Sequence, residues 1–149
     1  SPTAAVFIPH ANGTIIGKLL VAYSNGQTSN NAAGTYNLNH GLVMWDVDET
    51  SATAATLSNP IVVFDDSTVL FGISALTYDP ISGYLYVATA GEPGVVNQTT
   101  NGYGYNIERF SVAFDASHAP TLTRVTNAGK PFIKGGANTK CISSLALGD

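Results

Sequence analysis

A short stretch occurs twice in the chain, as Gly17-Lys18-Leu19-Leu20-Val21-Ala22 and, 66 residues later, as Gly83-Tyr84-Leu85-Tyr86-Val87-Ala88. Each copy starts with a turn glycine and continues with side chains that alternate between the two sides of an extended chain, which is the pattern of a β-strand. Two further pairs of segments repeat in the same order. Val43, Trp45, Val47 and Asp48 match Phe110, Val112, Phe114 and Asp115 at an offset of 67, and residues 73–76 match residues 142–145 at an offset of 69. The chain therefore contains two copies of one structural unit.

Each unit is predicted to contain four strands. They are expected at residues 4–8, 18–23, 41–47 and 61–64 in the first unit, and at residues 73–78, 84–89, 106–114 and 121–125 in the second. Asn12-Gly13 and the segment from Asp79 to Gly83 are predicted turns, because Pro80 fixes φ and glycine supplies a positive φ. Meandering four-stranded units in tandem are typical of β-propeller blades. The sequence thus predicts an all-β fold of antiparallel blades that is part of a β-propeller, with a β-sandwich as the alternative.

The blades divide the chain unevenly. We expect a single all-β unit in which residues 1–68 form the first blade, residues 69–138 the second, and residues 139–149 the first strand of a third. A propeller closes at about four to eight blades. Two blades and one strand are therefore expected to be part of a larger propeller, completed by the rest of the same protein or by another chain.

A family resemblance rests on the second unit. Tyr78-Asp79-Pro80 precedes the strand at residues 83–89, and residues 110–115 are followed by Leu122-Thr123. This order of an Asp-Pro turn, a Leu-Tyr-Val-Ala strand and two further strands resembles the YVTN and lactonase-like propeller repeats. The resemblance implies a propeller fold and, as an alternative function, part of a propeller hydrolase whose site is assembled from several blades. The repeat in this chain is longer than in those families.

The additional length lies between the second and third strands of each unit. Residues 24–40 and 90–105 are rich in Asn, Gly, Thr and Tyr, and connections of this length usually carry function or are disordered. In up-and-down blades these two connections would emerge on the same rim of the propeller. Tyrosine combined with Asn, Ser and Gly is typical of adaptable recognition surfaces, although the tyrosines could instead pack the loops onto the sheets. The predicted binding residues for a carbohydrate or protein ligand are Tyr23, Tyr36, His40, Tyr103 and Tyr105.

Composition excludes some classes of function. The chain has 6 Lys+Arg against 10 Asp+Glu and a formal net charge of −4, whereas a nucleic-acid-binding face needs clustered cations. No apolar run approaches the roughly 20 residues of a membrane-spanning helix, so we expect no membrane insertion. Only 11 % of the residues are charged. A surface rich in Thr, Asn, Ser and Tyr is frequent among secreted and cell-surface proteins, so we expect an extracellular or cell-surface location.

Catalytic and metal motifs are not found in the sequence. It lacks the nucleophile elbow, the H-E-x-x-H and C-x-x-C motifs, the P-loop and the EF-hand loop. Asp46 and Asp48 could contribute oxygen ligands to a calcium site, but a solvated turn is the expected state. His10, His40 and His118 are widely spaced, and each is expected to be a polar surface residue. The sequence therefore favours a binding or adhesion module without a cofactor over an enzyme, with a structural surface-layer or filament subunit as a third alternative.

Overall fold

The computed structural model describes residues 2–31, 34–66, 69–70, 72–90, 105–134 and 144–147. In this part of the chain the fold is all-β, and no helix is present that could cross a membrane. The predicted fold class is confirmed at this level. The strands are β1 (Pro2–Asn12), β2 (Ile15–Asn31), β3 (Gly34–Ser51), β4 (Ala54–Asp65), β5 (Ile73–Asp79), β6 (Tyr84–Ala90), β7 (Tyr105–Phe114), β8 (Pro120–Arg124) and β9 (Ile133–Lys134).

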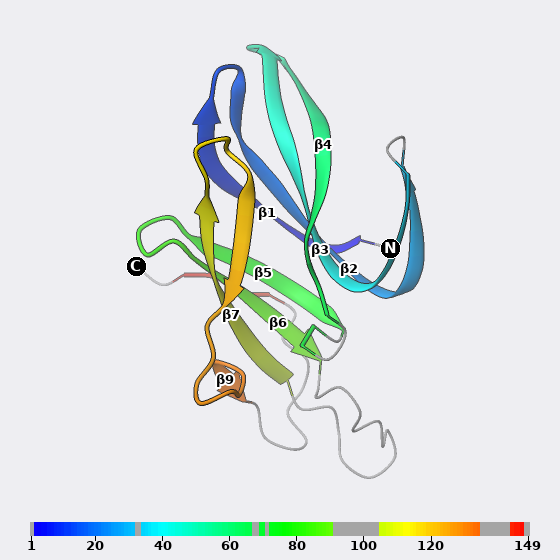
Figure 1. Ribbon diagram of the computed structural model, residues 1–149, viewed down its shortest axis with the longest axis vertical. Coiled ribbons are helices and arrows are strands. Elements are labelled where there is room, and N and C mark those ends of the chain that lie inside the picture. The colour runs from blue at the N-terminus through cyan, green and yellow to red at the C-terminus, as the bar shows by residue number, and fades with distance from the viewer. Residues whose placement is uncertain are drawn as a thin grey trace.

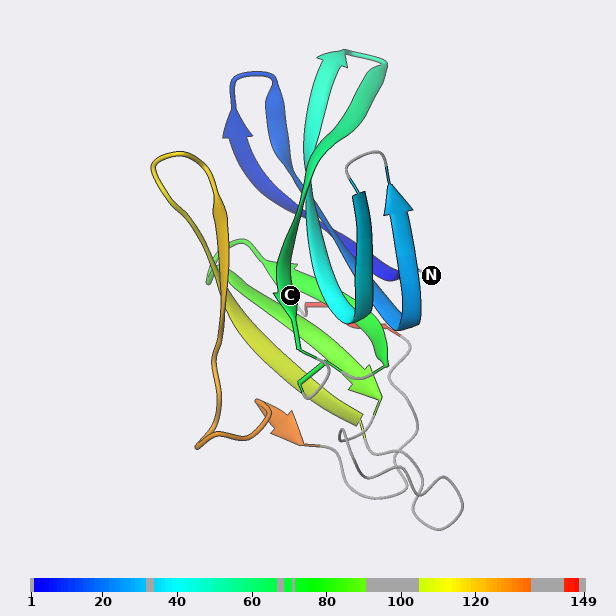
Figure 2. The same ribbon diagram turned by 45° about the vertical axis from the view of Figure 1, so that its right-hand side comes forward.

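The described strands form two antiparallel sheets that follow the order of the chain. The first sheet has the order β1-β2-β3-β4 and the second has the order β5-β6-β7-β8, with β9 also paired to β7. The two sheets pack against each other, with β1 beside β5 and β4 beside β8 (Figures 1 and 2). Two consecutive four-stranded meanders are thus stacked, as the repeat predicts.

Two predicted turns have the expected chemistry. Gly13 has φ +61° and Gly83 has φ +74°, values that a side chain would strain and that glycine adopts freely. In the second turn the Gly83 amide donates to the Asp79 carbonyl at 2.8 Å, and the Ile81 amide donates to the Asp79 carboxylate at 2.9 Å. Each hairpin between the first two strands of a unit is therefore fixed by its own turn sequence.

The hydrophobic core lies between the two sheets. Both sheets contribute aliphatic side chains that are fully or almost fully buried, and Phe110 of β7 meets the edge of Phe64 from β4 with ring centroids 4.8 Å apart. Burial of this apolar area is what holds the sheets together. The buried residues of the cluster are Ile8, Leu20, Ala22, Leu42, Met44, Leu70, Ile73, Leu76, Leu85, Val87, Phe110 and Leu122.

Matching residues of the two repeats point in different directions: those of the second sheet point into this core, and those of the first sheet point away from it. Leu85 and Val87 of β6 have no exposed surface and belong to the core cluster. Their repeat partners, Leu19 and Val21 of β2, alternate with the core residue Leu20 and therefore lie on the other side of the first sheet. The outer face of the first sheet, defined by Phe7, Leu19, Val21, Val43, Trp45, Val47 and Leu57, is consequently apolar.

The prediction of a loop at residues 24–40 is wrong. β2 and β3 continue through this range as a paired hairpin, with Ser24 opposite His40 and Asn31 opposite Gly34, and a register shift between Ser24 and Gln27. The hairpin turns back on the side of the first sheet that faces away from the second sheet (Figures 1 and 2). A polar two-stranded ribbon can form by backbone pairing without burying a face, so it has no apolar alternation for a sequence pattern to detect.

The predicted first strand of a third blade lies mostly outside the described residues. Within residues 139–149 the structure describes Ser144 to Leu147, and these four residues are not in a strand. The short strand β9 instead extends the second sheet, pairing Lys134 with Asn106 and Ile133 with Ile107 of β7.

Candidate functional site

The predicted rim residues come from the ends of neighbouring strands. Tyr23 lies in β2 opposite Gly41 and is half-buried, while Tyr36 and His40 lie in the β3 arm of the hairpin. Tyr105 is the first residue of β7 and pairs with Ala90, the last residue of β6. Tyr103 lies outside the described residues, as do the side chains of Tyr36, His40 and Tyr105. β2 and β3 leave the first sheet at the end where β6 finishes and β7 begins, but the hairpin then turns back along the outer side of the first sheet, so its turn points away from those ends (Figure 1).

The two aspartates considered for calcium lie in strand β3 and not in a solvated turn. Asp46 forms an ion pair with Lys18 of β2 and accepts a hydrogen bond from Asn59 of β4 at 2.9 Å. One oxygen of Asp48 is buried without a hydrogen-bond partner among the described residues. The ammonium group of Lys18 already occupies an Asp46 oxygen that a calcium ion would need, so the described contacts do not form a calcium site.

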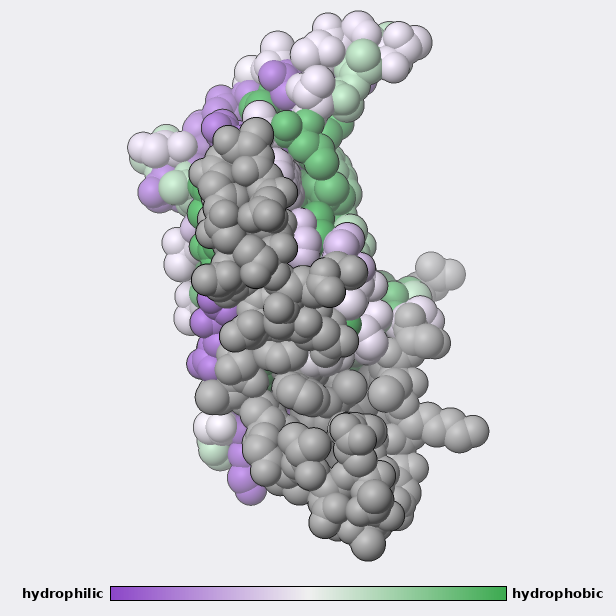
Figure 3. Space-filling view, turned by 90° about the vertical axis from the view of Figure 1, so that its right-hand side faces the viewer, coloured by the Kyte–Doolittle hydropathy of each residue, from purple (hydrophilic) through white to green (hydrophobic). Residues whose placement is uncertain are grey.

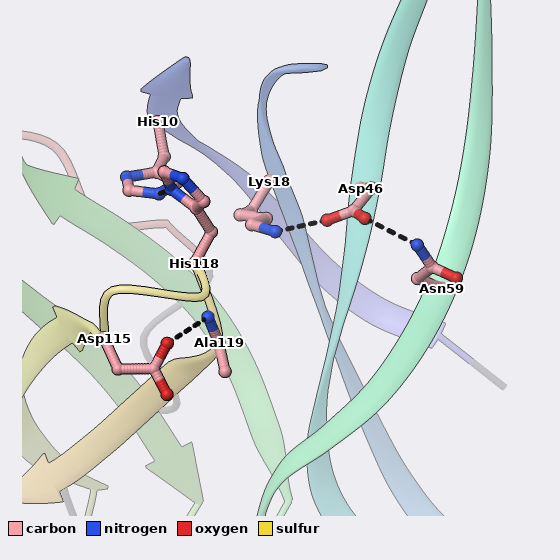
Figure 4. A network of polar contacts seen from close by, with 7 residues as sticks. All are labelled: His10, Lys18, Asp46, Asn59, Asp115, His118 and Ala119. Carbon is pink, nitrogen blue, oxygen red and sulfur yellow. Dashed lines mark hydrogen bonds and ion pairs between the residues drawn. The ribbon is translucent and has the colours of Figure 1, made fainter. Parts of the chain in front are cut away.

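Two histidines from different sheets meet where β1 approaches the β7–β8 turn. His10 Nε2 lies 2.9 Å from His118 Nδ1, which is hydrogen-bonding distance, so one ring donates the proton that the other accepts. The His10 ring also stacks on Phe114, with centroids 3.8 Å apart and planes inclined by 16°. Figure 4 shows the two imidazoles beside the Lys18–Asp46 pair. His10 and His118 are partly exposed, as expected of polar surface residues, but the contact between them was not predicted.

His118 is held in place by the turn that carries it. Its backbone has φ +62°, a left-handed conformation that is uncommon for a residue other than glycine. The Asp115 carboxylate accepts hydrogen bonds from the amides of Ser117 at 2.8 Å and Ala119 at 3.0 Å, and the Asp115 carbonyl accepts one from the His118 amide at 2.9 Å. These hydrogen bonds stabilise the left-handed backbone and fix where the His118 side chain leaves the turn.

The electrostatics around the histidine pair favour a neutral His10. Burial lowers the pKa of His10 below its usual value, the neighbouring His118 and Lys18 lower it further, and Asp46 opposes them. Burial alone would raise the pKa of Asp46, but the hydrogen bonds from Lys18 and Asn59 outweigh it and hold that pKa below its usual value. At pH 7 the site therefore contains a neutral His10 beside a compensated Lys18–Asp46 ion pair.

The chemistry of this arrangement follows from the two imidazoles. Neutral imidazoles supply nitrogen lone pairs for a proton or a transition metal. The described residues contain no group of three or more His, Cys, Asp or Glu side chains that could hold a metal ion. His10 and His118 form a hydrogen-bonded pair that joins the two sheets, with ring centroids 5.1 Å apart.

A second polar cluster lies on the face of the second sheet that is turned away from the first. The Arg109 guanidinium is placed between two aromatic rings, 4.5 Å from the centroid of Tyr84 and 4.1 Å from that of Phe132. Tyr86 also lies near Phe132, with centroids 5.9 Å apart. Stacking of this kind uses the planar guanidinium as a packing surface, and it fixes the segment that leads to β9 against the sheet.

Sequence reasoning missed the histidine pair, although one signal for it existed. In a four-stranded meander, the turn after the first strand and the turn after the third strand lie at the same end of the sheet. His10 follows the first predicted strand of one unit and His118 follows the third predicted strand of the other. Two stacked units therefore place both at one end, opposite the predicted rim.

Comparisons with protein-family models, with curated proteins and with solved structures found no match to this chain.

Proposed function

We propose that this chain is an extracellular or cell-surface binding module that contributes two consecutive blades to a β-propeller. Its ligand, a carbohydrate or a protein, binds at the rim where the β2–β3 hairpin and the ends of β6 and β7 emerge. The observation that carries the proposal is that these two connections leave the stacked sheets at the same end. The residues that we propose for ligand contact are Tyr23, Tyr36, His40, Tyr103 and Tyr105, because tyrosine and histidine in such segments suit adaptable recognition.

The direction in which the matching residues face supports propeller packing. Propeller blades are related by rotation about one axis, so each blade turns one face to the preceding blade and the opposite face to the following blade. Leu85 and Val87 face the first sheet, whereas their partners Leu19 and Val21 face away from the second. Two sheets related by a two-fold axis would instead bury equivalent faces, as in an isologous contact. The resemblance to YVTN-type repeats points in the same direction.

Replacing Tyr36, Tyr103 and Tyr105 together with alanine is expected to weaken ligand binding at least tenfold, because rigid aromatic contacts carry much of the energy in such surfaces. Binding to a panel of immobilised glycans (β-glucan, chitin and mannan) and to extracellular-matrix proteins measures this. Circular dichroism should remain that of the wild type. The matched control is Ile81→Ala, since Ile81 is 96 % exposed in the β5–β6 turn at the other end of the blade. Wild-type binding by the triple variant would contradict the rim proposal.

The outer face of the first sheet supplies the contact for completing the propeller. Phe7, Leu19 and Trp45 are neighbours across three strands, and Val47 pairs with Leu57 of β4. Phe7 is 43 % exposed and Leu57 is 50 % exposed, whereas Val21 and Val43 are already buried within the chain, on the side where the β2–β3 hairpin turns back, so the open part of the face is the part around Phe7 and Leu57. Figure 3 shows hydrophobic residues gathered over the part of the molecule that the first sheet forms. We propose that a blade of a second copy of the chain packs on this face, in a head-to-tail contact that can close into a ring.

The chain is therefore expected to form an oligomer of about two to four copies, the number that closes a propeller of two-blade units. Light scattering after size-exclusion chromatography measures its mass. Leu57→Glu should reduce the mass to that of the monomer, because a carboxylate in the contact would be buried without a partner. The matched control, Ile81→Glu, should leave the oligomer intact. A chain that is monomeric at all concentrations would contradict completion by a second copy.

A further inference from the structure

We propose that the hydrogen bond between His10 and His118 is an acid-sensitive contact between the two sheets, which is closed at neutral pH and opens when both rings are protonated. His10 lies near the end of β1, and His118 lies in the turn between β7 and β8. Their facing nitrogens are 2.9 Å apart, so the two rings share one hydrogen. The Lys18–Asp46 ion pair beside them, in contrast, joins two strands of the first sheet (Figure 4).

The contact depends on the number of protons that the two rings hold. With both rings neutral, one facing nitrogen carries a hydrogen and the other accepts it through its lone pair. A first additional proton binds at the remote nitrogen of the donor ring, and the hydrogen bond persists in a charge-assisted form. A second additional proton must bind at the accepting lone pair. Both facing nitrogens are then donors on neighbouring cations, and the hydrogen bond is lost.

The charges around the contact disfavour this doubly protonated state. Burial is the main cause that lowers the pKa of His10, followed by the neighbouring His118 and by Lys18 of β2, while Asp46 of β3 acts in the opposite direction. The carboxylate of Asp46 is already paired with the Lys18 ammonium group. It is therefore not available as a partner for a second imidazolium.

Other carboxylates at this end of the sheets are occupied as well. The Asp115 carboxylate accepts two hydrogen bonds from amides of the β7–β8 turn, and the Asp79 carboxylate accepts two within the β5–β6 turn. The His10 ring stacks on Phe114, and an aromatic face also attracts a cation. We therefore expect His10 to stay on Phe114 and the His118 ring to turn toward solvent. The end of β1 is then no longer joined to the β7–β8 turn.

The sign of the pH dependence follows from the lowered pKa of His10. In the unfolded chain the pKa of histidine is about 6.5, so the folded chain binds fewer protons than the unfolded chain as the pH falls below that value. Stability then decreases as the pH decreases. The contribution of the contact is fully present above about pH 6.5 and is lost as the pH falls through the lowered pKa of His10.

Thermal unfolding between about pH 7 and pH 5.5 tests the energetic effect, because most carboxylates stay ionised in this range. The Tm of the wild type is expected to fall by about 2 to 4 °C. His10→Gln should lose at least half of this decrease, since glutamine can donate to or accept from His118 and takes up no proton. His118→Asn, which tolerates the left-handed backbone, should behave in the same way. His40→Gln is the matched control and should keep the full decrease.

Nuclear magnetic resonance of the histidine rings tests the opening itself. At neutral pH the wild type is expected to show a nuclear Overhauser contact between the rings of His10 and His118, and this contact should disappear in parallel with the protonation of His10. All variants should keep the wild-type circular dichroism spectrum at pH 7. The proposal is overturned if the contact between the rings persists after both are protonated, or if the Tm of His10→Gln depends on pH as steeply as that of the wild type.

Discussion

Replacing Arg124 with methionine is expected to lower the free energy of unfolding by about 3 kcal/mol, because it leaves a buried carboxylate without its partner. The Glu108 side chain is 2 % exposed and the Arg124 side chain is 25 % exposed. Arg124 Nε donates to one Glu108 oxygen at 2.8 Å and Nη2 donates to the other at 2.9 Å. This bidentate contact joins β7 to the edge strand β8, and methionine has a similar length but no charge.

Urea unfolding followed by circular dichroism measures this change as a lower midpoint with an unchanged m-value. Thr123→Met is the matched control, because Thr123 is exposed on the same strand and the variant should change the free energy of unfolding by less than about 0.5 kcal/mol. Arg124→Lys should be intermediate, since lysine keeps the charge but loses the two-pronged geometry. An Arg124→Met variant as stable as the wild type would show that water, and not Arg124, solvates the Glu108 carboxylate.

Strands β5 to β8 of the second sheet could be predicted from the sequence almost residue by residue, whereas β9 was not predicted. Strands expected at residues 84–89 and 106–114 are found at Tyr84–Ala90 and Tyr105–Phe114. They were predictable because each has a buried side, which imposes alternation on the sequence, and because Gly83 ends the preceding turn in a conformation that few other residues adopt. Local chemistry and burial agree here.

The hairpin at residues 24–40 was not predictable for the opposite reason. Its backbone pairs continue from Ser24 opposite His40 to Asn31 opposite Gly34, yet its many Asn and Gly residues have low strand propensity. Backbone pairing between β2 and β3 begins in the buried part of the sheet and continues into the hairpin. Each further pair costs little conformational entropy, because the two strands are already aligned. Alternation of apolar and polar residues appears only where one side of a strand is buried. The hairpin extends beyond the part of the first sheet that packs on the second sheet, so its sequence lacks this alternation.

The candidate site depends on an arrangement that neither repeat contains alone. His10 and His118 are 108 residues apart in sequence, and each belongs to a different sheet. The meander topology places both at one end of the blades, but the 2.9 Å contact also requires the stacking angle of the sheets and the φ of +62° at His118. The packing of β1 on β5 and of β4 on β8 sets the angle between the sheets, and the Asp115 turn sets the backbone of His118. No spacing in the sequence encodes either.

Replacing Phe110 with alanine is expected to cost about 3 to 5 kcal/mol, because it empties the centre of the contact between the sheets. Phe110 has no exposed surface, and its ring meets Phe64 of the other sheet at 4.8 Å with planes inclined by 69°. Urea unfolding measures the loss. A double-mutant cycle with Phe64→Leu should give a coupling of about 1 kcal/mol for the edge-to-face pair.

The same unfolding curves show whether the two sheets unfold together, with Ile81→Ala as the control variant. Ile81→Ala removes a side chain that is 96 % exposed and should change the free energy of unfolding by less than about 0.5 kcal/mol. Because Phe110 packs against Phe64 of the other sheet, its loss should shift the unfolding of both sheets together, as one transition with unchanged m-value. If Phe110→Ala instead split the transition in two, the sheets would be independent units, and the contact between them would not be the core that holds the fold together.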